Sequence, residues 1–137
     1  ETGIGILASS VAAKIHKLEV LSHNIEDQLH NTTRFLIMSP TADHSARSPK
    51  MITTFVFEVR NIPAALYKVL GGFATNGINM TKLESYMVGG TFTATQFYAD
   101  IEGHPNHAAV AQALEELHHY TNKLDILGVY PAADGRS

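Results

Sequence analysis

Residues 51–80, MITTFVFEVRNIPAALYKVLGGFATNGINM, decide the fold. The first ten of them alternate between strongly apolar and more polar side chains, and this pattern predicts a β-strand with one apolar face. Pro63 then stands where a helix tolerates proline, in its first turn, and Asn76-Gly77 supplies residues that commonly end a helix. We therefore expect a strand over 51–60 followed directly by a helix. The apolar stripe of that helix is spaced i, i+3, i+4, i+7 and consists of Leu66, Val69, Leu70 and Phe73.

The chain beyond this helix completes a sheet. Residues 78–87 and 91–101 predict two antiparallel strands joined by a turn at 88–90, a second helix opens at 103–106, and a last strand covers 124–130. The order βαββαβ is the ferredoxin-like arrangement, within the α/β (α+β) class. Two helices then cover one face of the sheet, and we expect the other face to mediate dimerisation. The second helix has an apolar stripe of Val110, Ala113, Leu114 and Leu117.

The segment before the linker is too small to be a domain. Its 38 residues fall below the roughly 40 at which isolated domains become hard to stabilise. It must therefore pack against something absent from this sequence, or against another copy. The expected elements are a helix over 5–17, a short buried strand over 18–21, a polar loop over 22–31, a second strand over 33–38, and the proline-containing linker Ser39–Lys50.

The composition excludes several classes of protein. Hydrophobic residues make up 45% of the 137 residues and charged residues 17%, which is the balance of a folded soluble protein. The net charge is −3 without a basic stripe, so we expect no nucleic-acid partner. No apolar run is long enough to cross a bilayer, and no secretory signal opens the chain. There is no cysteine, which fits a reducing compartment, and we expect a cytoplasmic protein.

Two patterns that could suggest cofactor sites have simpler explanations. Gly3–Ala8 matches G-x-G-x-x-A, but that phosphate-binding motif requires a preceding strand, and flexible glycines before a helix explain it as well. Of the eight histidines, His104 and His107 are three apart, whereas His118 and His119 are adjacent and point about 100° apart on a helix. Solvated histidines explain this pattern better than a metal site.

Two further stretches could belong to a site, although spacing alone favours the ordinary explanation, a solvated carboxylate and a strand entrance. Glu84-Ser85 lies within a predicted strand, where the carboxylate is either solvated or holds the ammonium of a small ligand at a sheet edge. In Asn31-Thr32-Thr33-Arg34-Phe35, alternation along a strand puts Thr33 and Phe35 on one face and Arg34 on the other. The latter stretch is either an ordinary strand entrance or part of a cleft.

Together these pieces resemble one family, prephenate dehydratase with its C-terminal ACT regulatory domain. Residues 17–35 look like the last part of the family's two-lobed α/β catalytic domain, including its Thr-Arg-Phe motif. Residues 61–87 look like the ACT domain, including its Glu-Ser motif. The resemblance implies that 1–39 is the C-terminal segment of the catalytic domain, 40–50 is a linker, and 51–132 is the ferredoxin-like ACT domain.

The resemblance implies specific catalytic roles. Such enzymes convert prephenate to phenylpyruvate by loss of carbon dioxide and the ring hydroxyl, without a cofactor. Thr33 would assist the departing hydroxide, Arg34 would fix a substrate carboxylate or order the strand, and Phe35 would pack against the substrate ring. Because most of a two-lobed catalytic domain would precede Glu1, we expect no turnover from these 137 residues alone.

The resemblance also implies feedback inhibition by L-phenylalanine, bound between two ACT domains of a homodimer or homotetramer. Tyr86 and Met87 depart from the family's Glu-Ser-Arg-Pro motif, which bears on ligand affinity and identity. The alternative function is a free-standing ACT module that binds an amino acid and regulates another protein. The effector residues implied are Ala64, Ala65, Leu66, Asn79, Glu84 and Ser85.

Overall fold

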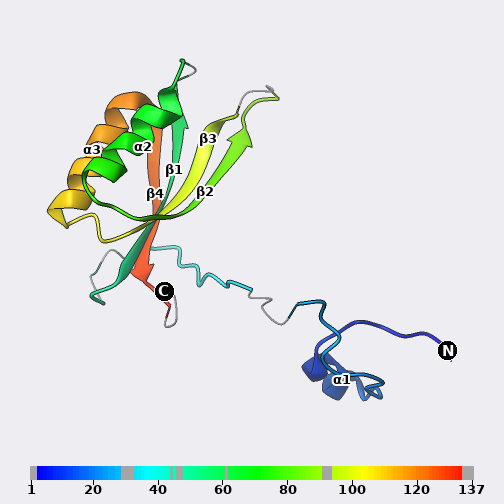
Figure 1. Ribbon diagram of the computed structural model, residues 1–137. Coiled ribbons are helices and arrows are strands. Elements are labelled where there is room, and N and C mark those ends of the chain that lie inside the picture. The colour runs from blue at the N-terminus through cyan, green and yellow to red at the C-terminus, as the bar shows by residue number, and fades with distance from the viewer. Residues whose placement is uncertain are drawn as a thin grey trace. The chain divides into compact units, whose positions relative to one another are not determined.

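The computed structural model describes residues 3–28, 33–43, 45, 48–60, 62–90 and 94–133. The chain divides into two units, Glu1–Met38 and Ser39–Ser137, and each is described by itself. The first unit contains helix α1 (Figure 1). The second has the element order βαββαβ, which confirms the predicted order. The elements are α1 (Ser10–His16), β1 (Met51–Val59), α2 (Ala65–Thr75), β2 (Met80–Met87), β3 (Ala94–Glu102), α3 (Ala108–Tyr120) and β4 (Thr121–Pro131).

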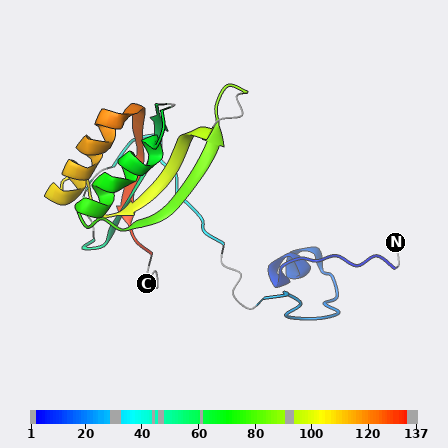
Figure 2. The ribbon, with the colours of Figure 1, turned by 45° about the horizontal axis from the view of Figure 1, so that its top comes forward.

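The sheet of the second unit has the strand order β2-β3-β1-β4, and every pair is antiparallel. Strand β1 is therefore central, while β2 and β4 are the edges. Helices α2 and α3 lie together on one face of the sheet, as both ribbon views show (Figures 1 and 2). The ferredoxin-like fold is confirmed, and within the described residues of this second unit no helix lies on the opposite face of the sheet, which we call the helix-free face.

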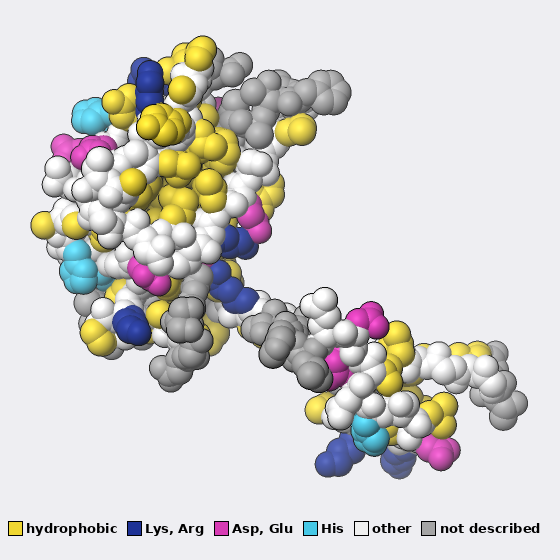
Figure 3. Space-filling model, viewed as in Figure 1, with side chains coloured by type: hydrophobic (Ala, Val, Ile, Leu, Met, Phe, Trp, Pro, Cys, Tyr) yellow, Lys and Arg dark blue, Asp and Glu magenta, His cyan; other side chains and the backbone are white. Residues whose placement is uncertain are grey.

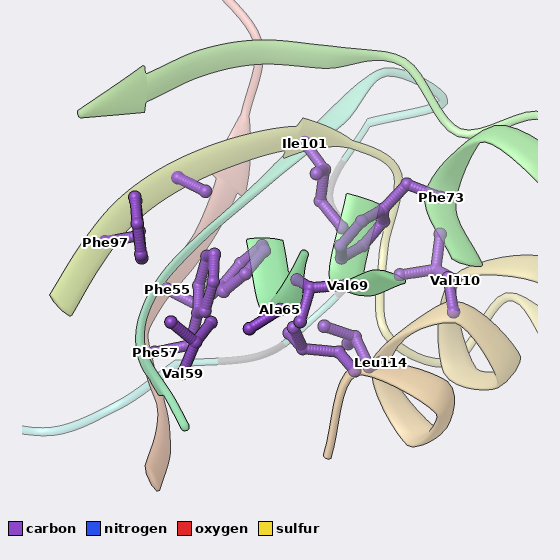
Figure 4. Close-up of a cluster of buried hydrophobic side chains, with 13 residues drawn as sticks. Phe55, Phe57, Val59, Ala65, Val69, Phe73, Phe97, Ile101, Val110 and Leu114 are labelled. Carbon is purple, nitrogen blue, oxygen red and sulfur yellow. The ribbon is translucent and has the colours of Figure 1, made fainter. Parts of the chain in front are cut away.

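The core lies between the two helices and the sheet (Figure 4). Alternate residues of β1 and β3 point towards the helices, and four phenylalanines pack in pairs, Phe55 on Phe73 at 5.8 Å and Phe57 on Phe97 at 5.3 Å between ring centroids. The helices supply the other side of the core through Val69 and Phe73 of the predicted α2 stripe and through all four residues of the α3 stripe, because residues three and four apart share one side of a helix. The buried members are Phe55, Phe57, Val59, Ala65, Val69, Phe73, Phe97, Ala99, Ile101, Val110, Ala113, Leu114 and Leu117.

The ends of several elements differ from the prediction. Helix α2 starts at Ala65 because Pro63 lies in the preceding turn, and it ends as expected with Gly77 at φ 67° and a hydrogen bond from Ile78 N to Phe73 O. Strand β4 starts at Thr121 instead of Leu124, because α3 passes into it without a loop. The other differences are β1 ending at Val59, β2 starting at Met80 and α3 starting at Ala108. Residues 91–93 of the predicted third strand lie outside the described residues.

The prediction for the N-terminal unit is wrong in its strands and too long in its helix. Helix α1 begins at Ser10 because the Ser9 hydroxyl accepts from Ala12 N, and it ends where Lys17 adopts φ 53°. Residues 18–21 and 33–38 form no strand. A strand needs a hydrogen-bonded neighbour, and the described part of this unit supplies none. Figure 3 shows hydrophobic side chains lying at the surface of this unit.

Two searches of the described residues bear on broad function. No helix there is long and apolar enough to cross a membrane. The described histidines, aspartates and glutamates form no group of three or more that could hold a metal ion.

Candidate functional site

The predicted catalytic motif lies at the end of the N-terminal unit. Asn31 and Thr32 fall outside the described residues, and Thr33, Arg34 and Phe35 lie in an irregular, exposed segment. The Phe35 side chain is 85% exposed and Ile37 is fully exposed. The predicted alternation of Thr33 and Phe35 against Arg34 is therefore not realised, since no strand forms. The catalytic roles of these three residues stay a prediction.

The predicted effector residues divide between two elements, and the first group lies at the start of α2. Ala64 is exposed and adopts φ 59°, a left-handed conformation that non-glycine residues adopt at a cost. Ala65 is buried and Leu66 packs partly buried against the core. A ligand could therefore reach the backbone and methyl group of Ala64 and the outer part of the Leu66 side chain, but not the side chain of Ala65.

The second group lies on edge strand β2. Glu84 pairs with Tyr98 and Ser85 with Phe97 of β3. Phe97 belongs to the core beneath the helices, so Ser85 faces the helical side. Glu84 faces the helix-free side. The two residues of the Glu-Ser motif thus lie on opposite faces, and a ligand that contacts both must reach around the edge of the sheet.

Both oxygens of the Glu84 carboxylate have partners on its own strand. The Tyr86 hydroxyl donates to Oε2 at 2.8 Å, and the Lys82 ammonium lies 3.0 Å from Oε1. The bond from Tyr86, followed by that from Lys82, lowers the pKa of Glu84 below its ordinary value. The bond to Glu84 raises the pKa of Lys82 and that of Tyr86. Lys82 Nζ also lies 5.0 Å from the centroid of the Tyr98 ring.

Asn79 lies at the other end of the unit from Ala64. It is exposed, follows the end of α2, and accepts a hydrogen bond from Glu102 N through its backbone oxygen. Helix α2 separates the two positions, and its 11 residues span about 16 Å at the usual rise per residue. One copy of the chain therefore does not gather Asn79 and Ala64 around one small ligand.

A polar cluster that the sequence does not predict lies at the centre of the helix-free face. Thr54 of β1 donates to Oδ1 of Asp100 on β3 at 2.6 Å, and its oxygen lies 2.7 Å from the hydroxyl of Tyr130 on β4. Asp100 is fully buried and Thr54 nearly so. The one available signal was an aspartate inside the otherwise apolar run 97–101.

One prediction about the histidines is wrong. His104 is not solvated but 2% exposed, and its Nδ1 accepts a hydrogen bond from Asn106 N at 3.0 Å. His107, His118 and His119 are exposed. In the N-terminal unit, the residues between Gly3 and Ser9 form no strand or helix, so they offer no phosphate-binding strand–turn–helix.

Comparisons with known proteins agree on one family. The sequence model of the prephenate dehydratase family matches residues 1–43. A bifunctional N-acyl-homoserine lactone acylase/prephenate dehydratase from Komagataeibacter europaeus is 52% identical over 95% of this chain and 47% of that protein. A bifunctional chorismate mutase/prephenate dehydratase from Aquifex aeolicus is 40% identical over 94% of this chain and 35% of its own length. The crystal structure of a prephenate dehydratase from Arthrobacter aurescens in complex with L-Phe matches at a TM-score of 0.62, with 31% identity over 70% of this chain and 32% of that chain.

The chain thus spans about half the length, or less, of the curated relatives it matches. The predicted resemblance to prephenate dehydratase is confirmed, and the similarity runs through both units. Thr33, Arg34 and Phe35 lie within the part that the family model matches.

Proposed function

We propose that this chain is the C-terminal part of a prephenate dehydratase that carries out the decarboxylating dehydration of prephenate to phenylpyruvate. The observation that carries the proposal is the similarity over nearly the whole chain to proteins named for this activity. As part of the proposal, the enzyme acts in the cytoplasm and supplies L-phenylalanine biosynthesis.

The proposed reaction needs little from a strong base. The carbon–carboxylate bond breaks, its electron pair enters the ring, and the ring becomes aromatic as hydroxide leaves with a proton as water. The difficult part is the departure of hydroxide, which a well-placed hydrogen-bond donor assists. Thr33 takes this role in the proposal, Arg34 fixes a substrate carboxylate, and Phe35 packs on the ring. A threonine hydroxyl is a weak acid, so its help comes mainly from position.

The exposure of this motif supports the view that the chain contains half a site. The side chains of Phe35 and of the apolar residues 36–38 after it are exposed, Phe35 to 85%. A catalytic site that excludes water requires further protein residues to cover this exposed segment. We therefore expect the 137-residue chain alone to give no turnover of prephenate.

The experiment joins this chain behind the corresponding N-terminal part of the Komagataeibacter europaeus relative and follows phenylpyruvate absorbance. We expect turnover from the joined protein and none from the chain alone. Thr33→Val should lower kcat at least about 100-fold, as expected for loss of an acid catalyst, whereas Thr33→Ser keeps the hydroxyl and most of the rate. Full activity of Thr33→Val, or a full rate from the chain alone, would contradict the proposal.

We also propose that the C-terminal unit is a regulatory ACT domain. It binds L-phenylalanine between two copies of the chain in a homodimer or homotetramer. Ala64 and Asn79 are too far apart in one copy to contact the same small ligand, which supports a site shared by two copies. In such a site, the start of α2 of one copy lies beside β2 of the other copy. In this site Glu84 holds the ligand ammonium, and Ser85, Ala65 and Leu66 shape its surroundings.

Titration calorimetry with L-phenylalanine should show binding that Glu84→Ala weakens. Asp125→Ala is the matched control, because Asp125 is also an exposed carboxylate paired with a lysine two residues before it.

Two other functions remain testable in the same preparations. The relative that is 52% identical also carries the name N-acyl-homoserine lactone acylase, so the joined protein should be incubated with such a lactone and assayed for the released fatty acid. The second is a free-standing amino-acid-binding module, which the complete core of the C-terminal unit would permit. L-Phenylalanine binding with no turnover in any joined protein would favour the module.

A further inference from the structure

The Glu84 carboxylate already holds an ammonium group, that of Lys82. The two residues are separated by one position on β2, so their side chains project from the same face of the strand. Lys82 Nζ lies 3.0 Å from Glu84 Oε1 and 5.0 Å from the centre of the Tyr98 ring, which belongs to the neighbouring strand. A carboxylate oxygen beside the face of a phenol ring is a usual environment for a bound ammonium.

We propose that Lys82 is an internal competitor for the ammonium subsite at Glu84, so that an amino-acid effector must displace the lysine before its own ammonium binds there. This inference rests on the proposed effector site. It goes beyond that proposal by assigning to Lys82 the role of setting the affinity for the effector.

The two ammonium groups would compete for the same carboxylate. Tyr86 donates to Oε2 of Glu84 at 2.8 Å and thereby fixes the orientation of the carboxylate. Oε1 is the oxygen that faces Lys82. A second ammonium would meet the lysine charge within a few ångströms of its own position, and like charges at that separation repel. Binding of the ligand ammonium at Glu84 is therefore disfavoured while Lys82 stays paired there.

The competition is weak enough for a ligand to win. Both side chains are partly open to solvent, with 37% of Lys82 and 45% of Glu84 exposed. Exposed ion pairs stabilise proteins only slightly, and removal of such a competitor corresponds to a change of up to about five-fold in a dissociation constant. Lys82 therefore tunes the affinity and does not close the site.

The test compares two lysine substitutions in the full chain by titration calorimetry with L-phenylalanine. Lys82→Met removes the competing charge and keeps a long unbranched side chain. Lys123→Met is the matched control, since Lys123 pairs at 2.9 Å with Asp125 two residues later on the other edge strand and its loss changes the net charge equally. We expect Lys82→Met to bind about three- to five-fold more tightly than the wild type, and Lys123→Met to bind with unchanged affinity.

The outcomes separate this inference from the proposed function. Tighter binding by Lys82→Met, or binding by that variant alone, supports the competition. Wild-type binding that Lys82→Met leaves unchanged or weakens overturns it and leaves the effector site standing; weakening would show that Lys82 holds the ligand carboxylate instead. An absence of binding to every variant overturns the effector site and the competition together. An equal gain in Lys123→Met would show a general charge effect and overturn the assignment to Lys82.

Discussion

Thr54 Oγ1 donates a 2.6 Å hydrogen bond to Asp100 Oδ1 and so joins two neighbouring strands beneath the surface of the helix-free face. A threonine hydroxyl has one proton, and this bond uses it. The 2.7 Å contact between Thr54 and Tyr130 must then be donated by the tyrosine. The chain of bonds runs from β4 through β1 to β3, and the buried carboxylate at its end accepts from Thr54.

The first prediction is that Thr54→Val lowers the free energy of unfolding by about 2 kcal/mol. Valine keeps the shape but removes a donor to a buried carboxylate, and hydrogen bonds to charged groups contribute about 1.5–3 kcal/mol. Tyr130→Phe removes the outer bond, between two uncharged groups, so it should lower the free energy of unfolding by about 1 kcal/mol. Urea unfolding measures both values. Equal stability of Thr54→Val and the wild type would show that the bond contributes nothing.

Two adjacent glycines of α2 should respond differently to alanine. A Cβ added at Gly72 would lie 2.7 Å from Oε2 and 3.2 Å from Cβ of Glu116 on α3, whereas one added at Gly71 meets nothing within 4 Å. Gly71→Ala should stabilise the protein by up to about 1 kcal/mol through helix propensity. The free energy of unfolding of Gly72→Ala should be at least about 1 kcal/mol lower than that of Gly71→Ala, because the added methyl group forces the two helices apart or moves Glu116. Thermal unfolding of the pair checks this, and equal gains would contradict it.

Ala64→Gly should stabilise the C-terminal unit. Ala64 adopts φ 59°, which costs a residue with a Cβ about 1–2 kcal/mol, while glycine increases the entropy of the unfolded chain by up to about 1 kcal/mol. We expect a net gain of about 0.5 kcal/mol in urea unfolding. Ala74→Gly, at an exposed helical position, is the control, and it should lower the free energy of unfolding by up to about 1 kcal/mol. A loss in Ala64→Gly would refute the strain at this position.

Tyr86 and Lys82 should each hold the pKa of Glu84 below its ordinary value. The pKa of Glu84 is lowered in the folded protein, so its two partners stabilise the fold above about pH 4.3, the ordinary value for glutamate. That stabilisation is lost as the pH falls through the lowered value. In an NMR titration of the side-chain carboxyl carbon, Tyr86→Phe and Lys82→Met should each raise the pKa of Glu84, and Lys123→Met should leave it unchanged. An unchanged pKa of Glu84 in either of the first two variants would contradict this.

Local patterns were sufficient for most of the C-terminal unit. The stripes of α2 and α3 and the strand pattern of β1 depend on side-chain spacing within one element, and the structure buries Val69, Phe73 and Leu117 as predicted. Element ends were less certain because they depend on turns, as at Pro63. The same spacing failed over 18–21 and 33–38, since a strand forms only with a partner.

The candidate effector site also was only partly predictable from the sequence. The resemblance identified Glu84 from sequence, but its bonds to Lys82 and Tyr86 and its position opposite Ser85 needed the sheet register. The sequence spacing of His104 predicts a solvated ring, because nothing in that spacing indicates the burial that the structure shows.

The sequence by itself determined the order of elements, the apolar faces and the resemblance to prephenate dehydratase, because each is encoded in residues that are near one another in the chain. Only the tertiary structure decided that Thr54, Asp100 and Tyr130 meet, across 46 and 76 positions of sequence. It also decided that Glu84 shares its carboxylate with an internal lysine. The physical reason is that hydrogen bonds and ion pairs act over a few ångströms, and distances across a sheet are fixed by strand pairing and not by spacing along the chain.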